Sequence, residues 1–240
     1  RLDGDTTWHQ WRDDLKQEVE SWDADLHEVR TNPSFPYEPA YLATLLRELL
    51  PEDTVLITGI GIRHAVGQHF PFLKERTQIV GSGFGTMGQE VAAPIGVRLA
   101  RPDTPVVGLV GDGAVMACLA ALPTAVAAGL HIVWLVVNNT GYASIAVYQA
   151  KHFGRHAGTY FRSVDGSAYE PDYVSLARSV GAQAERITDP EEFPELLATA
   201  LNNPATWVLE LPVTPTPRVL ASGHWDVNDI LAAGTKSENR

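Results

Sequence analysis

Two kinds of segment alternate along the chain after residue 37. Short apolar runs of the length typical of buried strands alternate with longer segments whose apolar residues recur at spacings of three and four, as in amphipathic helices. The expected strands are 55–58, 78–80, 106–110, 132–137, 182–187 and 207–211, and the expected helices are 38–50, 88–99, 115–128, 173–180 and 190–201. This alternation predicts an α/β fold, a doubly wound and mostly parallel sheet with helices on both faces.

The segment before this alternation has a helical pattern of its own. Its apolar residues follow one another at spacings of three and four, which predicts an amphipathic helix that ends before Asn32 and Pro33. The residues of this stripe are Trp8, Trp11, Leu15, Val19, Trp22 and Leu26. We interpret residues 1–36 as a connecting helix and linker, 37–215 as the α/β domain and 216–240 as a C-terminal tail, because the Val-Thr-Pro-Thr-Pro run cannot continue a central strand.

Composition excludes several classes of protein. Among 240 residues, 18 are basic and 29 acidic, and the net charge of -11 disfavours nucleic acid and anionic membranes as partners. The single cysteine, Cys118, rules out an internal disulfide framework and is interpreted as a small core residue. The single cysteine favours a cytoplasmic setting. No apolar run approaches the ~20 residues that span a bilayer. The chain begins at Arg1, which suggests a fragment or a processed subunit.

Two polar motifs follow directly after predicted strands. Gly111-Asp112-Gly113 follows the strand at 106–110, and Asn138-Asn139-Thr140-Gly141-Tyr142 follows the strand at 132–137. In doubly wound sheets ligands bind at the carboxyl ends of strands, where these motifs converge. The glycines let backbone approach a phosphate closely, and the carboxylate requires a bridging cation such as Mg²⁺. Jointly they predict a phosphate and metal site.

The two motifs together resemble the cofactor motif of thiamine-diphosphate enzymes. The run from Gly83 to Gly96 is similar to the turn and helix that precede it in the acetolactate synthase and pyruvate decarboxylase group, and the resemblance covers residues 37–215. The resemblance implies thiamine diphosphate and Mg²⁺ as cofactors. It implies that Asp112, the Asn139 side chain and the Gly141 carbonyl ligate the metal, that Met87 wedges beneath the cofactor, and that the Gly85 carbonyl accepts a hydrogen bond from its aminopyrimidine.

The resemblance also implies a second contact to the diphosphate, from the loop after the strand at 55–58. Ile62 and Arg63 stand there where the family commonly carries small polar residues or Gln-His, and His64 is interpreted as structural. The full set of expected cofactor-binding residues is Ile62, Arg63, Gly85, Thr86, Met87, Gly111, Asp112, Gly113, Ala114, Asn139, Gly141, Tyr142 and Ala143.

No catalytic residue is assigned within the chain. In this family a glutamate on a separate pyrimidine-binding domain activates the cofactor, and Glu90 does not stand at that position, so it is expected to be an ordinary helix residue. We therefore expect a partner chain or domain and a dimer or tetramer. The expected reaction is decarboxylation or carboligation of 2-oxo acids or related ketones, as in acetolactate synthases.

Three alternatives stay open: a C–C bond hydrolase of the same superfamily, a dinucleotide-binding oxidoreductase, and a non-catalytic cofactor-binding subunit. The second rests on Gly83-x-Gly85-x-x-Gly88, which also fits a dinucleotide fingerprint. The stretch 144–169 is interpreted as a loop that closes over substrate. His152 and His156, four residues apart, are interpreted as part of a solvated basic face rather than a zinc pair.

Overall fold

A six-stranded, all-parallel sheet is the centre of the molecule. The computed structural model describes residues 6–81 and 83–214. The strand order is β2-β1-β3-β4-β6-β5, with bounds β1 Val55–Thr58, β2 Gln78–Val80, β3 Val106–Gly111, β4 Ile132–Asn138, β5 Gln183–Arg186 and β6 Thr206–Pro212. All six predicted strands are present, each within one or two residues of its predicted ends. The predicted doubly wound α/β fold is confirmed.

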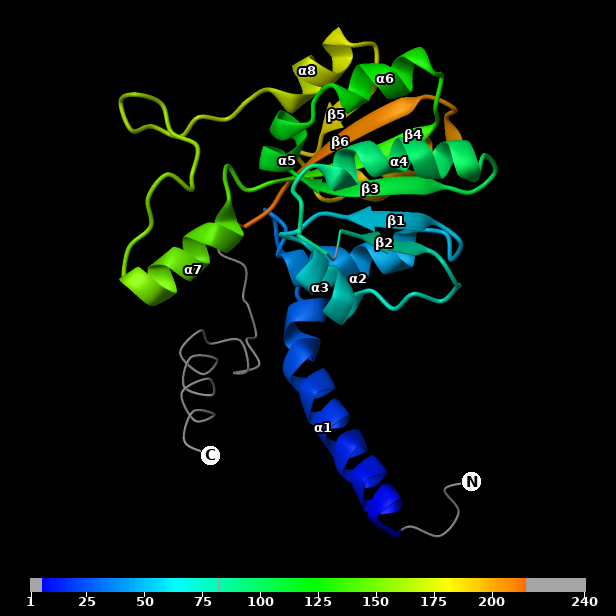
Figure 1. Ribbon diagram of the computed structural model, residues 1–240, viewed down its shortest axis with the longest axis vertical. Helices are drawn as coiled ribbons and strands as arrows, with labels where there is room; N and C mark the ends of the chain where they lie inside the picture. Colours follow the sequence, from blue (N-terminus) through cyan, green and yellow to red (C-terminus); the bar gives the residue numbers. More distant parts are fainter. Residues whose placement is uncertain (1–5, 82, 215–240) are drawn as a thin grey trace.

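Helices cover both faces of this sheet (Figure 1). Their bounds are α2 Pro39–Leu49, α3 Arg63–His69, α4 Gln89–Ala100, α5 Asp112–Ala117, α6 Ala121–Ala127, α7 Ala143–Phe153, α8 Tyr173–Ser179 and α9 Phe193–Asn202. One buried cluster joins α2, α3 and α9 to one face, around Leu46, Val66 and Leu197. A second joins α4, α5, α6 and α8 to the other, around Val91, Leu122 and Ala177. Of these eight helices, α7 extends away from the sheet (Figure 1).

The strand order reverses direction between β1 and β3. From β1 the chain moves outward to the edge strand β2, and it then returns past β1 to form β3 on the other side. Loops that leave the carboxyl ends of β1 and β3 therefore separate toward opposite faces, and such a switch point is where ligands bind in open α/β sheets. The segments that start at Gly59 and Gly111 border this point.

The predicted helix at 115–128 is wrong in extent. The helix begins earlier, at Asp112, and is interrupted after Ala117, where Cys118 leaves helical geometry at φ -129° and ψ 29°. A second helix, α6, starts at Ala121. Cys118 packs partly buried against the second core cluster, which confirms its interpretation as a small core residue.

The predicted loop at 144–169 is also wrong in its first part, because Ala143–Phe153 is helix α7. This helix leaves Ile145, Tyr148 and Phe153 exposed, so it lacks the buried apolar stripe that marks an amphipathic helix in a sequence. His152 lies in α7 and His156 follows its end, so the two histidines do not share a helical face.

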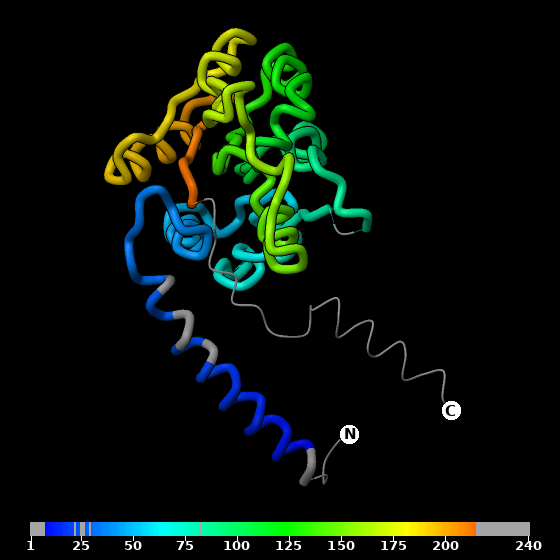
Figure 2. Tube along the Cα trace, turned by 90° about the vertical axis from the view of Figure 1, so that its left-hand side faces the viewer, coloured from blue at the N-terminus to red at the C-terminus, as the bar shows by residue number. Residues whose placement is uncertain are grey.

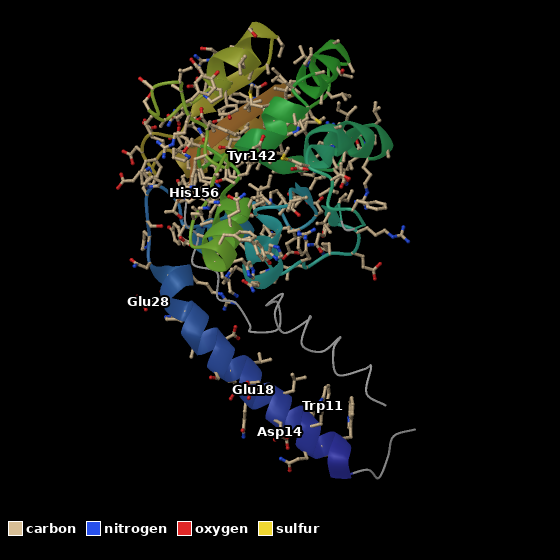
Figure 3. All side chains as sticks on the ribbon, turned by 60° about the vertical axis from the view of Figure 1, so that its left-hand side comes forward. Trp11, Asp14, Glu18, Glu28, Tyr142 and His156 are labelled. Atoms are coloured by element: carbon tan, nitrogen blue, oxygen red, sulfur yellow. The ribbon has the colours of Figure 1, made fainter. Side chains whose placement is uncertain are left out.

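The first helix, α1 (Thr6–Thr31), extends away from the α/β body, as Figures 1 and 2 show. Trp8, Trp11, Leu15 and Val19 of its apolar stripe are about half exposed. Side chains of the stripe at 22 and 26 lie outside those described. Figure 3 shows Trp11 and Asp14 standing out from this helix. The C-terminal end of this helix is attached to the α/β body through Arg30, which donates to His69 Nδ1 at 3.1 Å.

Among the described residues, no helix is both long enough and apolar enough to cross a membrane. The predicted tail at 216–240 lies outside the described residues.

Candidate cofactor site

Asp112 lies at the carboxyl end of β3, where the strand turns directly into α5. Its side chain is 2% exposed, and backbone N–H groups of Gly113 and Gly141 donate to its two oxygens at 2.7 Å and 3.0 Å. Burial raises the pKa of Asp112 from 3.8 to about 6, and the backbone hydrogen bonds oppose that rise. The carboxylate is therefore held in place but has no cation among the described side chains.

The two asparagines at the end of β4 have different surroundings. Asn138 is 4% exposed and fully bonded: its amide donates to Glu170 and Glu210, and its oxygen accepts from the N–H of Thr140 at 2.9 Å. The Oδ1 atom of Asn139 is buried and has no hydrogen-bond partner. A buried acceptor without a donor costs free energy unless a ligand satisfies it.

The turn from Thr140 to Tyr142 is held by a segment that follows α7. The N–H of Tyr142 donates to Thr159 O at 2.6 Å, and the N–H of Phe161 donates to Thr140 O at 2.9 Å. Gly141 pairs with Tyr160 in an isolated antiparallel bridge, and a Cβ atom at Gly141 would collide with the backbone oxygen of Thr159. Glycine is thus required here by close backbone packing.

These groups fit a hard divalent cation. The buried carboxylate of Asp112 lacks a positive partner among the described side chains, and the buried amide oxygen of Asn139 lacks a donor. Both residues directly follow neighbouring parallel strands, at the same edge of the sheet. Oxygen donors of this kind are what Mg²⁺ prefers. The set contains only one ionisable residue, so no cluster of three His, Cys, Asp or Glu is needed, and none occurs in the described part of the chain.

The glycine-rich turn before α4 borders the same region. Gly85 and Gly88 have positive φ angles of 61° and 95°, a conformation that glycine adopts without strain. Met87 is 41% exposed, although methionine is usually buried, and Thr86 is also exposed. The turn therefore presents Met87 outward, available to a ligand, and not as core filler.

Glu90 is not the ordinary helix residue that the sequence suggested. Its side chain is 3% exposed, and Oε2 accepts from the N–H of Gly88 at 3.0 Å. Burial raises its pKa. A Cβ atom at Gly59 would collide with this carboxyl group. Glu90 thus ties the Met87 turn to the loop after β1, and the glycine directly after β1 was the one sequence signal of that packing.

The loop after β1 provides less than expected. The side chain of Ile62 is 6% exposed and belongs to the first core cluster, so it is occupied by packing. Among the described residues, the guanidinium of Arg63 approaches Gly81 O, at 3.5 Å, and forms no ion pair, so it stays available to an anion. Desolvation and the neighbouring Arg63 lower the pKa of His64, which favours its neutral form.

The other predicted residues line the turns around Asp112 and Asn139. Gly111 ends β3, and Gly113, Ala114 and Ala143 are buried within the first turns of α5 and α7. Tyr142 is 37% exposed, and its ring packs edge-on against Phe161 at 5.3 Å between centroids. Figure 3 labels Tyr142 at the base of α7. Sequence reasoning missed the 159–161 segment and the roles of Glu170 and Glu210, because all of them depend on tertiary contacts.

Comparison with known proteins gives this site a context. The family model described as the thiamine pyrophosphate enzyme, C-terminal TPP binding domain, matches residues 59–211. The large subunit of acetolactate synthase isozyme 3 of Escherichia coli K12 is 30% identical over 204 residues, covering 80% of this chain and 33% of that protein. The 3D-(3,5/4)-trihydroxycyclohexane-1,2-dione hydrolase of Bacillus subtilis is 29% identical over 189 residues, covering 77% of this chain and 29% of that protein.

A solved structure shares the fold. The thiamine diphosphate-dependent 4-hydroxybenzoylformate decarboxylase of Rhodococcus jostii RHA1 superimposes with a TM-score of 0.69 at 22% identity, covering 77% of this chain and 34% of that one. The chain spans only about a third of the length of these relatives. The site at the ends of β3 and β4 lies inside the matched region. The chain belongs to the thiamine pyrophosphate enzyme family, and it corresponds to the C-terminal, TPP-binding domain of that family.

Proposed function

We propose that this chain is the diphosphate- and metal-binding half of an enzyme that uses thiamine diphosphate and Mg²⁺. In this proposal the enzyme acts on 2-oxo acids or related ketones by decarboxylation, carboligation or both. The observation that carries the proposal is the unpartnered Oδ1 of Asn139 beside the buried, cation-free carboxylate of Asp112. Both groups lie within the region matched by the TPP-binding family.

Each residue of the site has a proposed task. Asp112, the Asn139 side chain and the Gly141 carbonyl hold the cation, which in turn neutralises the diphosphate. Met87 supports the bent cofactor, and its exposure leaves it free to do so. The Gly85 carbonyl accepts a hydrogen bond from the aminopyrimidine. When bound, the cofactor supplies a nucleophilic carbon and an electron sink for cleaving the bond next to a carbonyl.

The chain needs a second domain to complete this site. The relatives are three times as long as the matched part, so the activating glutamate is proposed to come from a partner chain or from a domain outside these 240 residues. Met87 and Tyr142, in the turns that border the site, are exposed and available for such a contact. We propose a dimer or higher oligomer on this basis.

A C–C bond hydrolase is the second candidate function. It is supported by the Bacillus subtilis hydrolase, whose identity to this chain is similar to that of the acetolactate synthases. Membership of the TPP-binding family disfavours a dinucleotide-binding oxidoreductase, since the Gly83–Gly88 turn matches within that family. A non-catalytic cofactor-binding subunit remains as the third reading.

Calorimetric titration of thiamine diphosphate, with and without Mg²⁺, tests the cofactor assignment. We expect metal-dependent binding to the wild-type chain, alone or mixed with a partner that carries a pyrimidine-binding domain. Asp112→Ala should abolish it, and the exposed Asp103→Ala serves as the matched control. Binding that is absent in both settings, or that survives Asp112→Ala, would refute the proposal. Turnover of 2-oxo acids against cyclic diketones by the reconstituted enzyme then separates the first candidate from the hydrolase.

A further inference from the structure

The side chain of Asn138 holds the turn that carries Asn139 and Gly141 through a hydrogen bond to the backbone of Thr140. The Asn138 side chain bonds in three directions: its oxygen accepts from the N–H of Thr140, while its nitrogen donates to Glu210 at 2.7 Å and to Glu170 at 2.9 Å. Thr140 has a positive φ of 59°, which a β-branched residue adopts only when its surroundings enforce it. The Asn138 oxygen is one of the contacts that do so.

Two carboxylates that receive bonds from the same amide would repel each other without a cation. Arg186, at the end of β5, provides it: its guanidinium lies 2.8 Å from Glu170 and 3.5 Å from Glu210. Glu210 on β6 is 1% exposed, so it is expensive to keep charged unless it is paired. Arg186 therefore holds both acceptors of Asn138 in place.

Nothing in the proposed chemistry uses these groups directly. Arg186, Glu170 and Glu210 line an open cavity of about 400 Å³ beside α8, which also contains the separate ion pair of Arg178 and Glu185 at 2.7 Å. The cluster stands behind Asn138, whereas the unpartnered oxygen belongs to the next residue, Asn139. Its influence on the site must therefore pass through the backbone of the turn.

We propose that Arg186 and Glu210 are positioning residues for the metal-binding turn, acting through Asn138 on Thr140 and thereby on Asn139 and Gly141. This inference rests on the proposed function for the identity of the ligand, but its geometric part does not depend on any ligand. Residues that orient metal ligands without contacting the metal commonly influence metal affinity, and their mutation typically weakens it by roughly 10–100-fold. Here residues of β5 and β6, which carry no proposed ligand, would influence the affinity for the cation.

Arg186→Gln and Glu210→Gln test this, with Glu185→Gln as the matched control from the same cavity. Two quantities are measured on the full chain: amide hydrogen exchange in the peptide that spans 139–142, and the dissociation constant of Mn²⁺ in the presence of thiamine diphosphate. We expect faster exchange in that peptide and about tenfold weaker Mn²⁺ binding in both variants, in the range typical of outer-layer partners. Glu185→Gln should change neither.

The conservative Arg186→Lys keeps the proposal testable if the glutamine variants fold poorly, since it retains the charge and should recover most of the wild-type exchange protection. Exchange and Mn²⁺ affinity equal to those of Glu185→Gln would overturn the inference. Faster exchange spread evenly over β3 and β4 would also overturn it, because that is loss of stability and not of position. If wild type binds no Mn²⁺ either alone or mixed with a chain that carries a pyrimidine-binding domain, the proposed function fails, while hydrogen exchange at 139–142 still decides the positioning role.

Discussion

The backbone N–H of Gly141 donates to Oδ2 of Asp112 at 3.0 Å, which joins the carboxyl ends of the neighbouring strands β3 and β4. The same carboxylate accepts from Gly113 at 2.7 Å, so its orientation is set by backbone on both sides. A metal ligand held this way loses little side-chain freedom on binding a cation. Backbone hydrogen bonds therefore fix the orientation of this carboxylate in advance.

Asp112→Asn should separate metal binding from stability. The asparagine lacks the charge, so stabilisation by Mg²⁺ with thiamine diphosphate should disappear, whereas wild type should gain about 2.7 kcal/mol at ligand concentrations a hundredfold above Kd. In EDTA the free energy of unfolding of the variant should lie within about 1 kcal/mol of the wild-type value, because relief of a buried charge offsets the loss of one accepted hydrogen bond. Thermal denaturation with and without ligand measures both effects. Ligand-induced stabilisation that persists in the variant would contradict the assignment of Asp112.

Alanine substitutions at the two adjacent asparagines should differ in their effect on stability. Asn138→Ala removes three hydrogen bonds in the interior and leaves a buried carboxylate without its donor, so it should lower the free energy of unfolding by about 2–3 kcal/mol. Asn139→Ala removes an acceptor that has no partner, so stability in EDTA should stay within about 0.5 kcal/mol of wild type. Its Mn²⁺ affinity should nevertheless fall tenfold or more, roughly as for loss of a ligand. Denaturant unfolding distinguishes the two variants, while Mn²⁺ titration checks the role of Asn139, and equal stability losses would refute the division of roles.

Glu90→Gln should stabilise the chain increasingly as the pH rises. Burial raises the pKa of Glu90 above its ordinary value of 4.5, so the folded state binds its proton more tightly than the unfolded state does. Wild type therefore loses stability as the pH rises from about 4.5 through the folded pKa, and the glutamine variant does not. The advantage of Glu90→Gln should be smallest near pH 4 and constant above the folded pKa. Urea unfolding at pH 4, 6 and 8 measures it, with the exposed Glu191→Gln as control. A pH-independent difference would show that Glu90 is not the titrating group.

The sequence was sufficient for the sheet and for the two motifs at its edge. Buried parallel strands are continuous apolar runs, as at Val106–Gly111 and Ile132–Asn138, and glycine and asparagine stand out after them. Because parallel neighbours end at the same edge, Asp112 and Asn139 could be paired before any coordinates were known. Residue identity at strand ends is thus enough to place Asp112 and Asn139 at the same edge of the sheet.

Helix α7 and the bonding of Asn138 could not be predicted in the same way. Helix α7 leaves its apolar residues Ile145, Tyr148 and Phe153 exposed, so no buried stripe marks it. Asn138 and Asn139 are chemically identical in the sequence. Contacts with Glu170 and Glu210, 32 and 72 residues away, distinguish the bonded Asn138 from Asn139, whose Oδ1 is unpartnered. Information of this kind exists only after the chain has folded.

Tyr173→Phe tests whether the region behind the metal site is dry. The Tyr173 hydroxyl is buried and has no hydrogen-bond partner, and desolvation together with the charges of Asp112 and Glu210 raises its pKa. Removing an unsatisfied hydroxyl should leave stability unchanged or raise it by about 1 kcal/mol. Tyr37→Phe, which removes another buried and unpartnered hydroxyl, one that lies in the first core cluster on the other face of the sheet, is the control.

Equal behaviour of the two variants in denaturant unfolding would mean that both hydroxyls are unsatisfied for packing reasons alone. A loss above about 1 kcal/mol in Tyr173→Phe only would instead reveal a buried water between Tyr173 and the carboxylates, since such a water makes about three hydrogen bonds and is costly to lose. In that case, loss of the water should also weaken binding of the metal. Mn²⁺ affinity in Tyr173→Phe would then fall together with stability, whereas a dry site predicts that this affinity equals that of wild type.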